Sequence, residues 1–168
     1  MQRSTVDEKR EALLKYIIEN QADYYRLVYL YVRNRDNALD IIQDSIIKAW
    51  SKVHTLKNVK YMKTWLYRIM INESINFLRK NKRIILSDIE FEDASYSVES
   101  EVVDRLTLYQ AVEELPPKLK TVIALRFFED MKISEIAMTI KVNENTVKSR
   151  LYRGIKELKG IIGKGIYP

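Results

Sequence analysis

Residues 133–152 read ISEIAMTIKVNENTVKSRLY, a pattern typical of two short helices joined by a tight turn. The small Ala137 stands where two crossing helices must approach closely, and Ser134 and Asn143 can each cap a helix start. Lys141 stands in the turn, at some energetic cost if its φ angle is positive. The apolar residues that would pack the two helices together are Ile136, Ile140, Val142 and Val147. This spacing predicts a DNA-binding helix-turn-helix.

The second helix of this unit has two faces. One face is an apolar stripe with steps of three or four residues, expected to be buried: Val147, Leu151, Ile155, Leu158 and Ile162. The other face mixes cations with uncharged polar side chains: Asn145, Lys148, Ser149, Tyr152, Arg153 and Lys156. Lys and Arg bind phosphates or guanine edges, and Ser or Asn can reach bases or phosphates. The pattern favours DNA binding over an ordinary solvated helix.

Charge is distributed unevenly along the 168 residues, whose formal net charge is +6. Residues 1–83 carry 17 basic and 9 acidic side chains, residues 84–117 carry 1 and 9, and residues 118–168 carry 11 and 5. Two basic blocks around an acidic stretch favour two polyanion-binding domains and a linker that avoids the polyanion over three solvated surfaces with chance segregation of charge. Residues 87–101, SDIEFEDASYSVESE, contain six acids, no base and no helical apolar stripe, so we expect an extended linker.

Composition excludes several classes of protein. The chain has no Cys and a single His, His54, which leaves little room for metal sites or His-based catalysis. All four Gly residues follow residue 153, which excludes a P-loop and a dinucleotide-binding turn and argues against a sheet-rich fold. We therefore expect no enzyme activity, no catalytic residues, no metal and no cofactor. No apolar run approaches the roughly 20 residues of a membrane span, and no signal-peptide pattern opens the chain.

The periodicity of the apolar residues predicts an all-α protein. Thr5 and Glu8 form a capping-box pattern that opens a long helix, and Asn34 and Asn58 can cap the next two. The expected helices span residues 6–32, 36–53, 59–81, 99–114, 117–129, 134–140 and 144–160. The first three can share one core. Its inward positions in the second and third helices are Ala38, Ile42, Ala49, Val53, Met62, Trp65, Leu66, Ile69, Ile75 and Leu78.

The third expected helix also carries a polar stripe. Its members recur every three or four residues: Arg68, Asn72, Asn76, Arg79 and Arg83, extended by Lys80 and Lys82. Tyr61, Trp65 and Tyr67 lie near the start of the helix, although Trp65 falls on the inward face and is better interpreted as a core residue. Asn side chains, cations and aromatic rings together suit single-stranded DNA, where stacking contributes about 1–3 kcal/mol per base.

Four stretches together resemble the extracytoplasmic-function (ECF) sigma factors of bacterial RNA polymerase. They are residues 40–50 (DIIQDSIIKAW), residues 65–72 (WLYRIMIN) with Arg79 and Lys80, the pair Leu115 and Pro116, and residues 146–153 (TVKSRLYR). They occur in the order and spacing of that family, and the resemblance as a whole covers nearly the entire chain. The resemblance implies two small helical domains. Residues 6–83 would form sigma region 2, residues 84–99 an acidic linker, and residues 100–163 the helix-turn-helix domain, sigma region 4.

The resemblance also implies roles for individual residues. The minus-thirty-five element would be bound by Asn145, Thr146, Lys148, Ser149, Arg150, Tyr152 and Arg153. The minus-ten element would be read and opened by Leu56, Lys63, Arg68, Asn72, Asn76, Arg79 and Lys80, with Leu56 lining a pocket for a flipped base. The clamp coiled coil of the polymerase would be bound by Asp40, Gln43, Asp44 and Ile47.

Partners and a cellular location follow from the same resemblance, and three other classes of protein are alternatives to it. The resemblance implies core RNA polymerase (clamp coiled coil and flap), promoter DNA and an anti-sigma factor as partners. It also implies a cytoplasmic location, free or held at the membrane through that anti-sigma factor. An ordinary helix-turn-helix regulator, which binds promoter duplex without polymerase, is the main alternative. A helical adaptor would lack two basic faces, and a metal enzyme would have only Asp40 and Asp44 as paired carboxylates.

Overall fold

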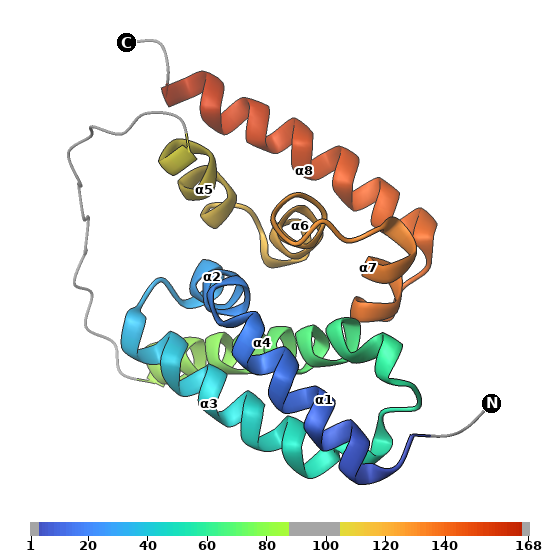
Figure 1. Cartoon of the computed structure of the whole chain (residues 1–168). Helices are drawn as coiled ribbons and strands as arrows, with labels where there is room; N and C mark the ends of the chain where they lie inside the picture. The colour runs from blue at the N-terminus through green and yellow to red at the C-terminus, as the bar shows by residue number, and fades with distance from the viewer. Residues whose placement is uncertain (1–3, 88–104, 166–168) are drawn as a thin grey trace.

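The computed structural model describes residues 4–87 and 105–165, and every regular element in these two ranges is helical (Figure 1). The N-terminal half contains α1 (Val6–Glu19), α2 (Gln21–Val32), α3 (Arg35–Lys52) and α4 (Met62–Ser87), with the 3-10 turns η1 (Val53–Thr55) and η2 (Val59–Tyr61) between α3 and α4. The C-terminal half contains α5 (Arg105–Glu113), α6 (Pro117–Ile123), the π-helical turn η3 (Ala124–Phe128), α7 (Ile133–Ile140) and α8 (Glu144–Gly165). The predicted all-α fold is confirmed.

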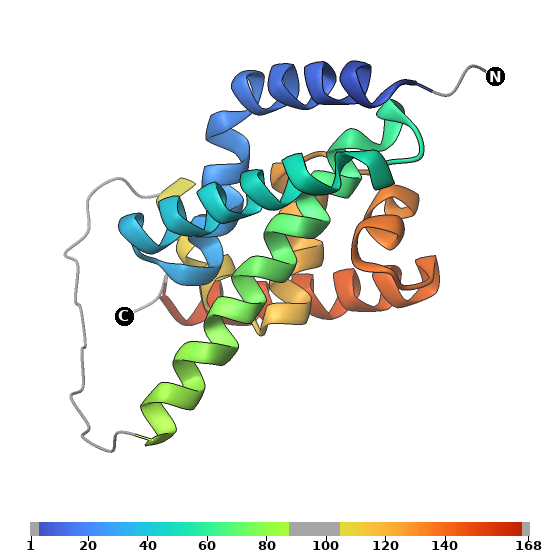
Figure 2. The ribbon, with the colours of Figure 1, turned by 90° about the horizontal axis from the view of Figure 1, so that it is seen from below.

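The helix predicted over residues 6–32 is wrong in one respect, because it is broken at Asn20. This residue has φ −120° and ψ 24°, and both its backbone N–H and its side-chain amide donate to the carbonyl oxygen of Tyr16. A side chain that binds the preceding turn competes with the helix ladder. Figure 2 shows α1 and α2 meeting at an angle. The helical spacing of the apolar residues continues across the break, and Leu13 of α1 and Val28 of α2 are buried in the same core.

The N-terminal half has its own core between α1, α2, α3 and α4. Of the inward positions predicted for α3 and α4, Ala38, Ile42, Ala49, Val53, Met62 and Leu66 are buried there. Trp65 and Ile69 are partly buried against the same core. Capping follows the sequence, since Thr5 and Glu8 form the reciprocal capping box and Asn34 accepts from the backbone N–H of Asn37 at 3.0 Å.

The helix-turn-helix is formed by α7 and α8. Asn143 caps α8 by accepting from the backbone N–H of Thr146 at 2.8 Å, and Lys141 takes the left-handed conformation with φ 54°. The prediction that Ser134 caps the first helix is wrong. That helix begins one residue earlier, at Ile133, and the backbone N–H of Lys132 donates to the Glu135 carboxylate at 2.7 Å. The Glu135 carboxylate thus closes the helix start in place of a Ser cap.

The apolar stripe of α8 differs from the prediction at one position. Ile155 is exposed, and Gly154 is buried instead. Two consecutive four-residue steps overrun two turns of 3.6 residues each, so position 154, seven residues after Val147, faces the same side as Val147 better than position 155 does. The buried residues Val147, Leu151, Gly154 and Leu158 are accordingly spaced by four, three and four residues. A Cβ atom at Gly154 would lie 2.8 Å from Cγ1 of Ile123, so this Gly allows α8 to approach α6 closely.

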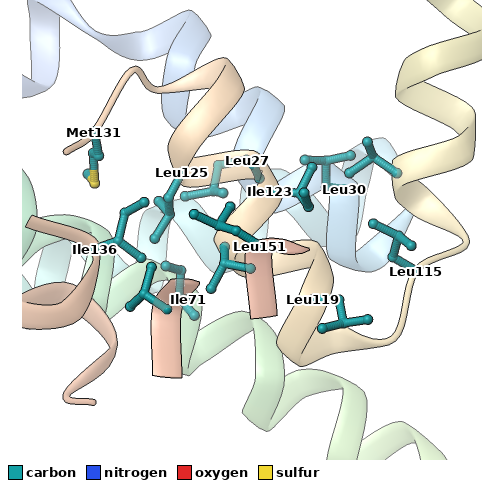
Figure 3. Close-up of a cluster of buried hydrophobic side chains, with 14 of the residues drawn as sticks. Leu27, Leu30, Ile71, Leu115, Leu119, Ile123, Leu125, Met131, Ile136 and Leu151 are labelled. Atoms are coloured by element: carbon teal, nitrogen blue, oxygen red, sulfur yellow. The ribbon is translucent and has the colours of Figure 1, made fainter. Parts of the chain in front are cut away.

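A second core joins the two halves of the chain. Leu27, Leu30 and Tyr31 of α2 and Tyr67 and Ile71 of α4 pack with residues of α5 to α8, as Figure 3 shows for several of them. α2 and α4 therefore lie between α1 and α3 on one side and α5 to α8 on the other (Figure 1). Ile75 and Leu78, predicted to face the N-terminal core, pack against this joint core instead.

The acidic linker falls mostly outside the described residues. α4 continues to Ser87, so residues 84–87, which were assigned to the linker, are helical. Residues 88–99 of the expected linker, and the start of the helix expected at residue 99, lie outside the described residues. The first helix after them, α5, is described from Arg105.

Candidate nucleic-acid interface

The polar face of α8 lies open to solvent. Asn145, Lys148, Ser149, Tyr152, Arg153 and Lys156 are all exposed, and Tyr152 has 75% of its surface accessible. Two other residues expected in this interface are half-buried. The Thr146 hydroxyl donates to Asn143 Oδ1 at 2.9 Å, and Arg150 lines a cavity that it shares with α4. The exposed group has the donors and cations needed to contact phosphates and base edges in a major groove.

A cationic groove runs between α3 and α4. It encloses about 440 Å³ and is lined by Lys48, Lys52, Ile69, Asn72, Glu73, Ile75, Asn76 and Arg79. Glu73 is paired with Lys48, so its negative charge is compensated. Asn72, Asn76, Arg79 and Lys80, four of the residues expected to bind the minus-ten strand, are exposed along or beside this groove. Sequence reasoning missed Lys48 and Lys52, because only the packing of α3 on α4 brings them to the polar stripe.

Two other residues expected to hold the minus-ten strand are turned toward the C-terminal half. Arg68 Nε donates to the carbonyl oxygen of Thr139 at 2.9 Å, and its Nη2 donates to that of Met138. Burial lowers the pKa of the Arg68 guanidinium. Lys63 Nζ donates to the backbone carbonyl of Glu129 at 2.7 Å. In this arrangement both cations are engaged within the chain.

Two side chains considered for contact with the minus-ten strand are buried in this arrangement. Leu56, expected to line a pocket for a flipped base, is only 2% exposed and belongs to the N-terminal core. Its position after a 3-10 turn directs an apolar side chain inward, where burial is favourable. Tyr67 is also fully buried, whereas Tyr61 is 49% exposed and is the aromatic ring near the start of α4 that a base could reach.

The cavity between the two halves is also cationic. It encloses about 450 Å³, and six cationic side chains line it: Arg68, Arg79, Lys82, Lys118, Lys141 and Arg150. Ile71, Ile75 and Ile140 supply apolar lining, and no carboxylate lines it among the residues that the structure describes. Cationic side chains from both basic blocks of the sequence therefore meet here.

The face of α3 directed away from the core combines acids with apolar side chains. Asp40, Gln43, Asp44 and Ile47 are all exposed, and Ile47 has 61% of its surface accessible. Leu39 and Trp50 are also exposed on α3, at 46% and 39%. The spacing of residues 39, 43, 47 and 50 puts them on one side of the helix. These four positions form an exposed row, apolar at Leu39, Ile47 and Trp50, beside the acids of α3.

These features define a helical protein with a DNA-binding helix-turn-helix, a second cationic surface and a separate face suited to a protein partner. Residues 17–84 match the family model described as Sigma-70 region 2, and residues 105–158 match Sigma-70, region 4. The RNA polymerase sigma factor SigV of Bacillus subtilis (strain 168) is 45% identical over 148 residues, covering 88% of this chain and 89% of SigV. The chain belongs to the ECF group of sigma-70 factors.

Two further known proteins are similar to this chain, one in sequence and one in fold. The ECF RNA polymerase sigma factor SigW of Bacillus subtilis (strain 168) is 29% identical over 154 residues, covering 80% of each chain. Among solved structures, the sigma factor RpoE in complex with the anti-sigma factor NepR from Bartonella quintana has a TM-score of 0.71 at 22% identity, covering 89% of this chain and 97% of that one. Within the described residues, no helix is long and apolar enough to cross a membrane.

Proposed function

We propose that this ECF sigma factor binds core RNA polymerase and directs it to promoters through two DNA elements, aiding the melting of the start region. The observation that carries the proposal is the exposed face of α8, which presents Lys148, Ser149, Tyr152 and Arg153 to solvent. The chain matches the family models of both sigma regions. These four side chains would enter the major groove of the minus-thirty-five element, with Arg150 on the DNA backbone or bracing the fold.

The minus-ten element would be bound along α4. Asn72 and Asn76 offer amides that can pair with unstacked bases, and Arg79 and Lys80 offer charge to the strand. Lys48 and Lys52 on the opposite wall of the groove add charge from α3. Opening duplex DNA costs roughly 1.4 kcal/mol per stacked step, so a groove that captures unstacked bases offsets part of that cost.

The partners of the proposed function occupy different surfaces. Core polymerase would contact the α3 face with Asp40, Gln43, Asp44 and Ile47 through its clamp coiled coil, and its flap would contact the C-terminal half. An anti-sigma factor is a further expected partner, because the solved sigma factor RpoE, which shares this fold, was determined in complex with one. The nucleotidyl-transfer chemistry would belong to the polymerase, with no catalytic residue supplied by this chain.

A footprint on promoter duplex separates this function from that of an ordinary helix-turn-helix regulator. The chain, core polymerase and their mixture are each tested on fragments from a genomic promoter library. We expect protection only with the mixture, and its loss with Lys148→Ala but not with the matched variant Lys159→Ala, which changes an exposed cation further along α8. Full protection by the chain alone, unchanged by polymerase, would establish the regulator instead.

A further inference from the structure

The cationic cavity between the two halves of the chain contains side chains that the proposed function does not use. Lys118 and Lys141 line it from the C-terminal half, and neither is expected to contact DNA or polymerase. We propose that this cavity binds a small organic di- or triphosphate, with the phosphates held by its cations and the organic group placed on its aliphatic lining. This binding site is additional to the promoter-binding surfaces and requires neither polymerase nor DNA.

The size and the lining of the cavity are those of a small-molecule site. Its volume of about 450 Å³ falls within the roughly 300–1,000 Å³ of such sites, which combine apolar walls with a few polar groups. Asn72 contributes an exposed amide that can donate or accept a hydrogen bond. The aliphatic lining consists of Ile71, Ile75, Leu78, Pro117 and Ile140. Inorganic phosphate would leave this lining uncovered, so the complementary ligand carries an organic group.

The positive charge of the cavity is not compensated within the described residues. Six cations line the cavity, and no carboxylate of the described ranges does. The ion pairs found between described residues involve none of these six cations. Charges of one sign around a cleft with low-dielectric walls reinforce each other's field and concentrate counter-ions there. A ligand with several negative charges is therefore favoured over one with a single phosphate.

Arg68 makes the α7 side of the cavity suitable for an anion. The carboxyl end of a helix carries a partial negative charge, which repels a phosphate. Arg68 Nε and Nη2 donate to the carbonyl oxygens of Thr139 and Met138, in the last turn of α7. A guanidinium thus covers the helix end, and the next residues along the chain lead directly to the cation of Lys141. The wall that the helix dipole alone would make negative is cationic.

Lys141 has a strained backbone at this wall. It ends α7 with φ 54° and ψ 52°, a left-handed conformation that Gly adopts without steric cost and Lys does not. The turn would therefore be more stable with Gly at this position. Strained residues of this kind cluster at ligand-binding and active sites. A phosphate-binding role for the Lys141 ammonium accounts for a Lys at a position that disfavours it.

Isothermal titration calorimetry of the full chain at low ionic strength tests the site. The probes are ATP, geranyl diphosphate, AMP and inorganic tripolyphosphate. We expect ATP or geranyl diphosphate to bind at least about fivefold more tightly than tripolyphosphate, which has no organic group to bury, and more tightly than AMP, which has one phosphate. Tighter binding of ATP identifies the organic group as a planar base, and tighter binding of geranyl diphosphate identifies it as an aliphatic chain. Added salt should weaken the binding.

Two variants and a matched control assign the binding to the cavity. Lys118→Gln and Lys141→Gly should each weaken binding of the tighter probe by about fivefold to tenfold, because each removes a cation that can donate to a phosphate. Lys159→Gln removes an exposed cation of α8 that does not line the cavity, and it should leave the affinity unchanged.

The stability of one variant separates loss of the site from loss of the fold. Lys141→Gly should raise the melting temperature of the unliganded chain by about 2–4 °C, because Gly relieves the left-handed strain. A weaker affinity in a more stable chain cannot result from unfolding. Lys118→Gln should also raise the melting temperature at low salt, since it removes one of several like charges around the cavity.

Four results would overturn the proposal. Neither organic polyphosphate binds at millimolar concentration, or AMP binds as tightly as the better of the two. Tripolyphosphate binds as tightly as the organic probes, which would leave a site for bare anions only. Lys118→Gln and Lys141→Gly bind the tighter probe with the wild-type affinity, which would place the binding outside the cavity. None of these measurements uses polymerase or promoter DNA, so their failure leaves the proposed function to its own test.

Discussion

The Tyr67 hydroxyl and the Glu129 carboxylate, 62 residues apart in the sequence, are joined by a 2.6 Å hydrogen bond across the two halves of the chain. Burial raises the pKa of both groups, so Tyr67 stays protonated and serves as the donor. Lys63 Nζ donates to the Glu129 backbone carbonyl at 2.7 Å, and Arg26 Nη2 lies 3.6 Å from the Glu129 carboxylate. Glu129 therefore contacts three polar side chains of the N-terminal half, through its carboxylate and its backbone carbonyl.

Gly154 should be required for the approach of α8 to α6. Gly154→Ala places a Cβ 2.8 Å from the buried Ile123 side chain, and we expect overpacking to outweigh the gain in helix propensity and lower the free energy of unfolding by about 1 kcal/mol. Gly160→Ala is the control, because no atom lies within 4 Å of its added Cβ, and it should raise stability by about 0.5–1 kcal/mol. Urea unfolding measures both. Equal effects of the same sign would contradict the packing described here.

Lys120 should make stability depend on pH. Burial lowers the pKa of its ammonium to about 8, and Nζ donates to the Leu30 carbonyl at 3.1 Å. Between about pH 8 and the unfolded pKa of 10.5, the unfolded chain binds more protons than the folded one, so the free energy of unfolding should rise with pH.

The size of that rise can be measured by denaturation at pH 8.0 and pH 9.5. We expect about 1–2 kcal/mol from this group in the wild-type chain. Lys120→Met should remove this increase, and Lys118→Met, an exposed neighbour, should preserve it. A wild-type profile that matches Lys120→Met would show that Lys120 is not buried as a cation.

Ile47 should contribute to polymerase binding without supporting the fold. Its side chain is 61% exposed on α3, so Ile47→Asp should lower the affinity for core polymerase by about tenfold or more and leave thermal stability unchanged. Ile18→Asp is a matched control, since Ile18 is 67% exposed on α1. Fluorescence anisotropy of the labelled chain with core polymerase provides the affinities. A loss with Ile18→Asp and none with Ile47→Asp would move the binding surface to α1.

Lys148 should bind a phosphate or a guanine edge in the minus-thirty-five element. If it contacts a phosphate, Lys148→Ala should weaken binding of the polymerase complex to all promoters alike and reduce the slope of log affinity against log salt by about 1. If it contacts a guanine, the loss should be confined to promoters with that base and amount to about 1–3 kcal/mol. Titrations at several salt concentrations on two promoters distinguish these cases. No change in either quantity would remove Lys148 from the interface.

The sequence predicted correctly those features that neighbouring residues determine. Asn34 and Asn143 cap α3 and α8 as predicted, because a short polar side chain before an apolar period decides the helix start. The same reasoning missed the break at Asn20, since the apolar period continues across it. It also assigned Leu56 to a base pocket by resemblance, and could not show that packing buries this side chain in the N-terminal core.

Contacts between distant segments could not be predicted. Arg68 was recognised as part of a polar stripe, but its bonds to backbone carbonyls at the end of α7 involve no side-chain pattern that a sequence displays. The burial of Glu129 could not be predicted either, because a single acid after an apolar helix usually lies in solvent. The exposed faces of α3 and α8 were predictable, since both follow from helical periodicity alone.

Run-off transcription tests the central claim most directly. Bacterial core polymerase is supplied with a library of promoter fragments, with and without the full chain. The account predicts discrete transcripts that appear only with the chain, are reduced by Asn72→Ala at the melting step, and are reduced by Lys148→Ala at initial promoter binding. Transcripts that are the same with and without the chain, on fragments that include its own upstream region, would contradict the assignment as a functional sigma factor.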